Sequence, residues 1–392
     1  MDNDVIILGN NYYSVLGAAR SLGEAGYHSR LLVMQKAAKK IAGSSKYVRN
    51  CIKTTLDYTQ IYQDLEQLRG TSDQILIIPI HDRTLRMLDE HEAELSEHYL
   101  FPRIFGGKTI THYMDKMVQK ELAQQCGLLT AKGRICKTDD AGIEQTVNEI
   151  DFYPCFTKPL ASFRCNAAKG IFAICRNEEE LRKALMNAKH KGSDSILVEE
   201  FLDIEKELSV YGFAVDGKVY MPARMDMIRS GFGRHKGVAA EGIITSSETF
   251  GELKQKLIRF VEEMHFSGLF CIDLIQSNSK IYFSEMNLRC GANGYAVTKA
   301  GVNLYALYAD MIYHKTSEKP TDIVKETHFL CEHIETDAFL DGFISYKEMK
   351  SNLSHEGVRF IEDREDPAPW HAAKRLAAKQ YMTKRIKRIL RP

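Results

Sequence analysis

The chain has 392 residues, of which 44% are apolar and 27% charged, so it is long enough for several modules that share a cleft. Its 53 basic and 52 acidic residues give a formal net charge of +1, which excludes a general electrostatic affinity for nucleic acid. The nine cysteines are scattered without CxxC pairs, no stretch approaches the roughly 18 apolar residues of a membrane span, and the start MDNDVIILG does not resemble a signal peptide. We therefore expect reduced thiols and a cytoplasmic location.

The first 35 or so residues predict the opening βαβ unit of a parallel sheet. An apolar run at residues 5–8 is followed by a turn at Gly9, a helical pattern at 14–25 and a second apolar run at 29–33. Some nucleotide-dependent dehydrogenases begin in this way, but Gly9 and Gly17 stand eight residues apart and do not complete a GxGxxG motif. The pattern therefore argues against a dehydrogenase.

Another buried strand is predicted at residues 74–80, and His81-Asp82-Arg83 follows it directly. Polar side chains at the carboxyl end of a parallel strand lie where open α/β sheets bind ligands. For Asp82 the N-cap of the following helix is the simpler interpretation. Beyond residue 115 the sequence changes to short strands between helices, which indicates a second, smaller α+β unit.

The sharpest chemical signal is a predicted hairpin, GLFCIDLIQSNSKIYFSEMNLRCGANG, at residues 268–294. Asp273 lies inside its first strand, and Glu285 and Asn287 alternate on the second. Residues two apart in a strand point to the same face, so the three side chains can converge across the pair. Hard oxygen ligands on one face suit Mg²⁺ that bridges phosphates. A lone Asp in an apolar strand is costly without a partner, which disfavours a plain surface hairpin.

Cationic residues suited to phosphate groups occur in several segments. Arg289 lies further along the predicted hairpin face, where a fixed guanidinium can stabilise developing negative charge. Lys116 begins a helix, Lys158 ends the apolar run YPCFTKP, and Lys169 and Gly170 lie in a loop of small and polar residues. A lysine at a strand end can bind phosphates while backbone N–H groups of a loop cover them. A solvated surface position is the alternative for each lysine.

The stretch SILVEEFLDIEKELSV combines a buried strand with acidic residues. Glu199 and Glu200 end the strand, Phe201 and Leu202 follow, and Glu207 comes shortly after. A carboxylate and backbone groups at a strand end can bind an adenine edge, and an acid seven or eight residues on can bind ribose hydroxyls. A solvated run of charges is the alternative.

The order of these pieces over roughly residues 1–310 resembles the ATP-grasp superfamily. The resemblance implies that ATP binds between two units together with Mg²⁺, for which Mn²⁺ can substitute. Residues 162–170 would cover the phosphates. The implied roles are ATP-phosphate binding by Lys116, Lys158, Lys169 and Gly170, adenine binding at Glu199, Glu200, Phe201 and Leu202, ribose binding by Glu207, metal binding by Asp273, Glu285 and Asn287, and catalysis by Arg289 and Lys158.

The stretch MPARMDMIRSGFGRHKG carries the candidates for substrate binding. Arg224, Arg229, Arg234 and Lys236 surround two glycines in this stretch. Its place opposite the predicted nucleotide suits a substrate carboxylate or an acyl phosphate. A solvated loop is the alternative.

The fold class expected is α/β and α+β multidomain, an ATP-grasp fold with a Rossmann-like N-terminal domain. The expected divisions are 1–107 (Rossmann-like), 108–200 (small, lid-bearing), 201–316 (nucleotide and metal) and 317–392 (C-terminal appendage). The implied enzyme is an ADP-forming ligase that joins a carboxylate to an amine through an acyl phosphate, and adding an amino acid to a cell-envelope or other metabolite precursor is one option. An ATP-dependent carboxylase that phosphorylates bicarbonate and a non-catalytic nucleotide-binding module are the alternatives.

The tail WHAAKRLAAKQYMTKRIKRILRP carries eight basic residues and no acid. Helical spacing predicts an amphipathic helix whose apolar stripe contains Leu376, Met382, Ile386, Ile389 and Leu390. We expect the stripe to pack on the enzyme; peripheral attachment to an anionic membrane, or capture of a polyanionic precursor, is the alternative. The expected partners are small-molecule carboxylate and amine substrates, with no nucleic acid, and a homodimer stays open.

Overall fold

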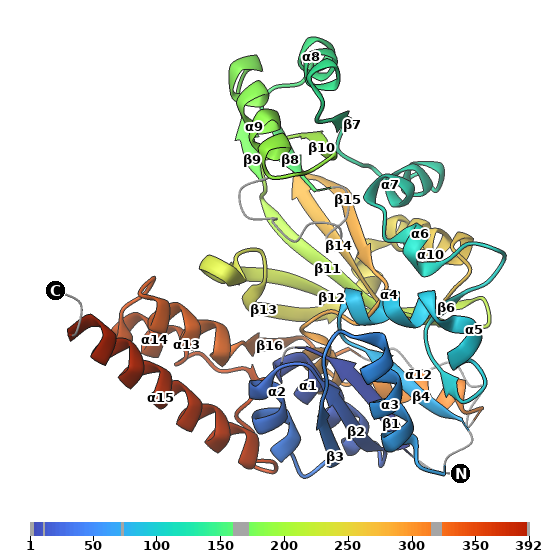
Figure 1. Ribbon diagram of the computed structural model, residues 1–392, viewed down its shortest axis with the longest axis vertical. Helices are drawn as coiled ribbons and strands as arrows, with labels where there is room; N and C mark the ends of the chain where they lie inside the picture. Colours follow the sequence, from blue (N-terminus) through green and yellow to red (C-terminus); the bar gives the residue numbers. More distant parts are fainter. Residues whose placement is uncertain (1–3, 11, 72–73, 160–171, 315–323, 390–392) are drawn as a thin grey trace.

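The computed structural model describes residues 4–10, 12–71, 74–159, 172–314 and 324–389, and Figure 1 shows their arrangement. Of Arg234 and residues 385–389 only the backbone is described. Within these residues the strands form three principal sheets: one at the N-terminus, one in a small unit and a large central one. The helices that follow the central sheet along the chain lie beside the N-terminal unit (Figure 1).

The N-terminal sheet is parallel, with the strand order β3-β2-β1-β4-β5. Alternate residues of β1 enter different hydrophobic cores, which explains why its sequence is continuously apolar. The strand order reverses between β1 and β4, so their carboxyl ends flank a crevice of the kind that binds ligands. The elements are β1 (Asp4–Gly9), α1 (Tyr12–Glu24), β2 (His28–Val33), α2 (Lys36–Ile41), η1 (Ala42–Ser44), β3 (Val48–Lys53), α3 (Tyr58–Arg69), β4 (Ile75–Pro79), α4 (Asp82–Glu90), α5 (Glu92–Leu95) and β5 (Tyr99–Leu100).

The small unit, at the top of Figure 1, is an antiparallel sheet of order β7-β10-β8-β9 with two helices packed on one face. Cys155, Ile196 and Val198 point into the core with these helices. Because side chains alternate along a strand, Lys158 and Glu199 lie on the opposite face. The elements are β7 (Gly133–Lys137), α8 (Asp140–Glu149), β8 (Cys155–Lys158), β9 (Ala173–Cys175), α9 (Glu178–His190) and β10 (Ser195–Glu200).

The central sheet has the order β15-β14-β11-β12-β13-β16-β17 and is antiparallel except for its last pair. Its predicted hairpin is present: Asn278 and Ser279 connect β14 to β15 with φ of 48° and 60°, the left-handed conformation that two-residue hairpin turns require. The strands are β6 (Arg103–Ile104), which pairs with β14, β11 (Lys206–Val215), β12 (Lys218–Ser230), β13 (Ala239–Ser246), β14 (Phe266–Ser277), β15 (Lys280–Asn287), β16 (Thr327–Leu330) and β17 (Val358–Arg359). The helices are α6 (Ile110–Tyr113), α7 (Lys116–Gln125), η2 (Gly233–His235), η3 (Ser247–Phe250), α10 (Glu252–Glu263), α11 (Gly294–Lys299) and α12 (Leu304–Ile312).

The segment after residue 316 is integrated into the body rather than appended to it. Its strands β16 and β17 extend the central sheet, and its helices are α13 (Glu332–Asp341), α14 (Tyr346–Asn352) and α15 (Ala368–Ile389). Arg20 of α1, which is fully buried, donates to Asp366 Oδ2 at 3.0 Å and to the carbonyls of Phe360, Ile361 and Asp366 at 3.0 Å each. These charge-assisted hydrogen bonds fasten the segment to the N-terminal unit.

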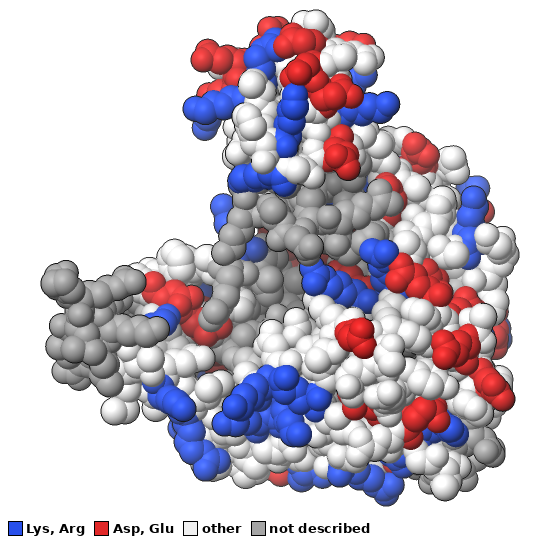
Figure 2. Space-filling view, in the orientation of Figure 1, with Lys and Arg blue, Asp and Glu red and all other residues white. Residues whose placement is uncertain are grey.

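Helix α15 packs on the body through its first turns. Trp370 and Leu376 join the main core, whereas Met382 is 63% exposed and Tyr381 stacks on Phe339 at 5.8 Å. Of the predicted apolar stripe, therefore, Leu376 packs on the enzyme and Met382 does not. The side chains of Ile386 and Ile389 and the whole of Leu390 lie outside the described part of the chain. The described basic side chains of α15, Lys374, Arg375, Lys379 and Lys384, are exposed, and Figure 2 shows basic side chains gathered over α2 and α15. No helix among the described residues combines the length and apolar character needed to cross a membrane.

Candidate active site

The predicted metal-binding side chains lie together on the β14–β15 hairpin. Asp273 is opposite Glu285 in the strand pairing, with an irregularity directly after Asp273. The amide of Asn287 donates to Asp273 Oδ2 at 2.9 Å, and the hydroxyl of Ser209 donates to Asp273 Oδ1 at 2.7 Å. Burial, reinforced by the neighbouring Glu285 charge, raises the pKa of Asp273 to about 6. Two carboxylates and an amide therefore share one face of the hairpin.

Lysines neutralise the carboxylates around this face. Lys116, at the first position of α7, forms an ion pair with Glu285. Burial disfavours the charged form of Lys116. The Glu285 carboxylate favours that form, and the net result is a raised pKa of Lys116. Lys158 pairs with Glu199, which also accepts from Lys120 Nζ at 2.9 Å. Burial, together with the nearby Lys116 charge, lowers the pKa of Lys158 despite the Glu199 partner.

Arg289 is held by an acidic residue of the N-terminal unit. Its Nε donates to Asp82 Oδ1 at 2.7 Å, and one Nη donates to Asn287 Oδ1 at 3.3 Å. Burial opposes ionisation of Asp82, but Arg289 holds the pKa of this carboxyl below its ordinary value. Asp82 is the first residue of α4, and the N-cap is His81, whose Nδ1 accepts from the Arg83 N–H at 3.2 Å. The expected cap role of Asp82 is therefore wrong, because His81 already occupies that position.

The residues expected to contact adenine and ribose have defined partners. Glu200 accepts from the Lys132 N–H at 3.0 Å, and the Phe201 N–H donates to the Pro154 carbonyl at 2.9 Å. Leu202 is partly exposed beside them. Burial raises the pKa of Glu207. Glu207 lines a cavity of about 330 Å³ that also contacts Asp273, Glu285, Asn287, Arg289 and the start of α11.

The structure does not bring the substrate-binding candidates together. Arg224 forms a two-point ion pair with Asp226 at 2.6 and 2.8 Å and lies over the Phe250 ring, on the side of the sheet that carries η3. Arg229 pairs with Glu241 at 3.2 Å and also with Glu335. Both arginines thus lie on strand β12 beside acidic partners, which corrects the alternative that the stretch is a solvated loop. The Lys236 side chain is exposed, and the Arg234 side chain, Lys169 and Gly170 lie outside the described part of the chain.

Three residues of the site were not expected from the sequence in these roles. Lys120 stands four positions after Lys116 and so shares its helix face, which is a signal that the sequence does contain. Ser209 pairs with Asp273 through the register of β11 and β14. Asp82 meets Arg289 across 207 residues of chain, and local patterning carries no information about such a contact.

The donor set of the hairpin fits Mg²⁺. Carboxylate and amide oxygens are the hard ligands that this ion prefers, and Asp273 and Glu285 stand opposite each other on the hairpin. Among the described residues no group of three or more His, Cys, Asp or Glu side chains could bind a metal, and the hairpin offers two carboxylates and one amide. The metal-binding role predicted for Asp273, Glu285 and Asn287 therefore fits the chemistry of these side chains and stays a prediction.

Comparisons with known proteins relate the chain to one domain family and to several enzymes. Residues 121–303 match the family model for the ATP-grasp domain. A D-alanine–D-alanine ligase of Bacillus velezensis is 26% identical over 55% of this chain and 62% of its own length. A formate-dependent phosphoribosylglycinamide formyltransferase of Bacillus subtilis is 27% identical over 44% of each chain. The chain thus spans less than two thirds of the length of these curated relatives.

Solved structures share the fold over most of the chain. An N5-carboxyaminoimidazole ribonucleotide synthetase in complex with ADP superposes with a TM-score of 0.64 at 17% identity, covering 84% of this chain and 81% of its own. A biotin carboxylase of Campylobacter jejuni gives a TM-score of 0.65 at 18% identity, covering 82% and 74%. The fold is therefore the ATP-grasp fold with a Rossmann-like N-terminal unit, as the sequence predicted. Residues 121–303 thus match an ATP-grasp domain, and the curated relatives that the chain resembles are named as a ligase and a transferase.

Proposed function

We propose that this chain is an ATP-dependent, ADP-forming ligase that joins a carboxylate to an amine through an acyl phosphate. The observation that carries the proposal is the convergence of Lys116 and Lys158 with the paired carboxylates Asp273 and Glu285. Phosphoryl transfer depends on positioning and charge neutralisation, so cations for phosphates beside hard-oxygen ligands for a metal are what it requires. The match to a D-alanine–D-alanine ligase further supports this choice of chemistry.

In the proposed first step an oxygen of the substrate carboxylate attacks the γ-phosphorus of ATP. The bond from that phosphorus to the β–γ bridging oxygen breaks, so ADP leaves and an acyl phosphate remains. Lys116 and Lys158 bind the phosphates, and Glu199, held by Lys120, fixes the position of Lys158. Mg²⁺, when bound, neutralises charge on the phosphate oxygens.

In the second step the amine nitrogen attacks the carbonyl carbon of the acyl phosphate. The carbon–oxygen bond to phosphate breaks, orthophosphate leaves, and the nitrogen loses its extra proton to solvent. Arg289 stabilises the negative charge that develops on the carbonyl oxygen, because Asp82 holds its guanidinium beside the metal-binding face.

The test is to identify the nucleotide product and trap the intermediate. Purified protein is incubated with MgATP and pools of carboxylates and amines, and nucleotides are separated by chromatography. We expect ADP and orthophosphate, and a hydroxamate when hydroxylamine replaces the amine. Formation of AMP and pyrophosphate would refute the acyl-phosphate route. Phosphate release that depends on bicarbonate and needs no amine would identify a carboxylase instead.

A further inference from the structure

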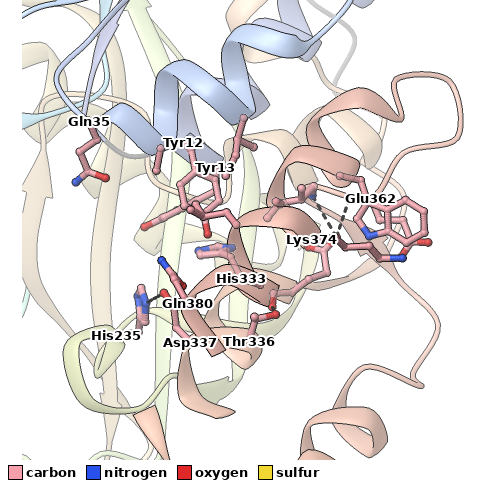
Figure 3. A pocket seen from close by; sticks show the side chains of 18 of the residues that line it. Tyr12, Tyr13, Gln35, His235, His333, Thr336, Asp337, Glu362, Lys374 and Gln380 are labelled. Atoms are coloured by element: carbon pink, nitrogen blue, oxygen red, sulfur yellow. Dashed lines mark hydrogen bonds and ion pairs between the residues drawn. The ribbon is translucent and has the colours of Figure 1, made fainter. Parts of the chain in front are cut away.

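A cavity of about 660 Å³ lies between the N-terminal unit and the C-terminal helices, apart from the residues of the candidate active site (Figure 3). Its volume falls within the roughly 300–1,000 Å³ typical of small-molecule sites. Segments far apart in the sequence form its walls: the first turn of α1, helix α2, the turn at η2, helix α13 and helix α15. A cavity built from so many segments exists only in the folded chain.

The cavity adjoins the candidate active site. Val238 lines both this cavity and the cavity that contacts Asp273 and Arg289. Tyr13, in its wall, lies near Arg289: burial raises the pKa of Tyr13 to about 12, with the Arg289 charge acting in the opposite direction. Tyr13 follows β1 and Asp82 follows β4, so both stand at the point where the strand order reverses. The cavity therefore lies where a second substrate could reach the candidate active site.

Aromatic rings make up much of the wall. Tyr13 stacks on His333 with centroids 3.8 Å apart, Tyr12 meets His333 edge-on at 5.7 Å, and Trp370 stands on α15. In Figure 3 the two tyrosines point toward His333 from α1. The ammonium of Lys374 lies 3.3 Å from the Trp370 ring centroid. One aromatic face in this wall is thus already covered by a cation, an arrangement that aromatic rings favour electrostatically.

The charged groups of the wall are mainly acidic. The acidic residues that line the cavity are Glu332, Asp337 and Glu362. Among the described lining residues the only lysine or arginine is Lys374. Asp337 lies 2.9 Å from His235 Nε2. Aromatic faces together with carboxylates favour a positively charged ligand that carries an apolar group.

Hydrogen bonds to the backbone hold this wall in place. The Glu332 carboxylate accepts from the N–H groups of Phe360, Ile361 and Glu362 at 2.9, 3.1 and 2.9 Å, which ties α13 to the segment before α15. Arg20 ties the same segment to α1. The cavity is therefore preformed, and binding does not have to order its walls.

We propose that this cavity binds the amine acceptor of the reaction, as a protonated amine with a flat, apolar body. The proposal rests on the proposed ligase function and names the acceptor class for it. The aromatic rings contact the body of the ligand, and Asp337 pairs with its ammonium. The ammonium gives up a proton to solvent before its nitrogen attacks the acyl phosphate.

Trp370 allows a direct binding test, because it is the only tryptophan of the chain and lines the cavity. The full-length protein without ATP is titrated with benzylamine at pH 7, and Trp370 fluorescence is recorded. Benzyl alcohol and phenylacetate are the uncharged and anionic probes of similar shape. We expect saturable binding of benzylamine and at least about tenfold weaker binding of the other two, because they lack the charge-assisted contact.

Two variants with opposite expected effects keep the test independent of folding failures. Asp337→Asn should weaken benzylamine binding about tenfold or more, because the charge-assisted contact is lost. Lys374→Gln should strengthen it, because the competing cation leaves the Trp370 face. Asp341→Asn, an exposed substitution on the same helix, is the matched control and should bind as the unmodified protein does.

The proposal is overturned by equal binding of the three probes, by absence of a fluorescence response, or by weaker benzylamine binding in Lys374→Gln. These results do not depend on turnover. Saturable, charge-selective amine binding without ADP release or hydroxamate formation would leave the cavity assignment standing and refute the ligase function. ADP release without charge-selective amine binding would support the ligase function and refute the cavity assignment.

Discussion

The contact between Asp82 and Arg289 gives the sharpest test of the site, because it joins the N-terminal unit to the metal-binding hairpin. We expect Asp82→Asn to lower kcat while the KM for ATP changes little. Asn can still accept one hydrogen bond but cannot pair with the guanidinium charge, so Arg289 loses its fixed position beside Asn287. Since Arg289 holds the pKa of Asp82 below its ordinary value, the pair is intact at neutral pH and is lost only as the pH falls through that lowered pKa.

The expected loss of kcat depends on how far the Asp82–Arg289 pair is exposed to solvent. A hydrogen bond between charged groups contributes about 1.5–3 kcal/mol, and solvent screening reduces this because the two side chains are 34% and 21% exposed. An increase of about 1–2 kcal/mol in the barrier corresponds to a loss of about 5- to 30-fold in kcat. The assay is steady-state ADP release at saturating ATP, with Glu90→Gln, an exposed ion-pair residue of the same helix, as control. A higher KM for ATP at unchanged kcat would refute the reasoning.

Three further predictions concern Glu285, Asp273 and Arg20. Glu285→Gln should abolish turnover with little change in melting temperature, and near-normal ADP release from the folded variant would contradict the metal assignment. The folded-state pKa of Asp273 is raised to about 6, so the stability of the ligand-free protein should increase as the pH falls through that value. The stabilisation that MgADP provides should decrease over the same pH range. Thermal melts from about pH 8 to 5, with and without MgADP, measure both effects. Arg20→Met should destabilise the fold by about 3–5 kcal/mol because it leaves Asp366 buried without its guanidinium, and a denaturant midpoint within error of the unmodified protein would refute this.

The hairpin shows how far local patterning reaches. Alternation along strands indicated that Asp273, Glu285 and Asn287 share a face, and in the structure Asn287 contacts Asp273 there. The turn at Asn278 and Ser279 could also be predicted from the sequence, because these residue types occur in turns, and both adopt the left-handed conformation here. Strand period and turn chemistry are local properties, so a single sequence contains them.

The basic stretch at residues 221–237 shows where the same reasoning fails. Arg224 and Arg229 look available for an anionic substrate when only their neighbours in sequence are considered. In the fold, Asp226 binds Arg224 across a two-residue step of the strand, and Glu241 and Glu335 approach Arg229 from β13 and α13. Charge in a sequence shows that a partner is needed, and only the packing determines whether that partner is a ligand or another side chain.

The sequence by itself determined the order of the elements and which faces of its strands carry charge, because periodicity and residue chemistry act over a few positions. The likeness to ATP-grasp proteins came from the resemblance of the ordered motifs to that superfamily. The tertiary structure decided that Asp82 meets Arg289, that Lys120 and Lys158 share Glu199, and that α15 closes one side of an aromatic cavity. These contacts join residues tens to hundreds of positions apart, and they arise when buried surfaces of separate units pack together, which no local pattern encodes.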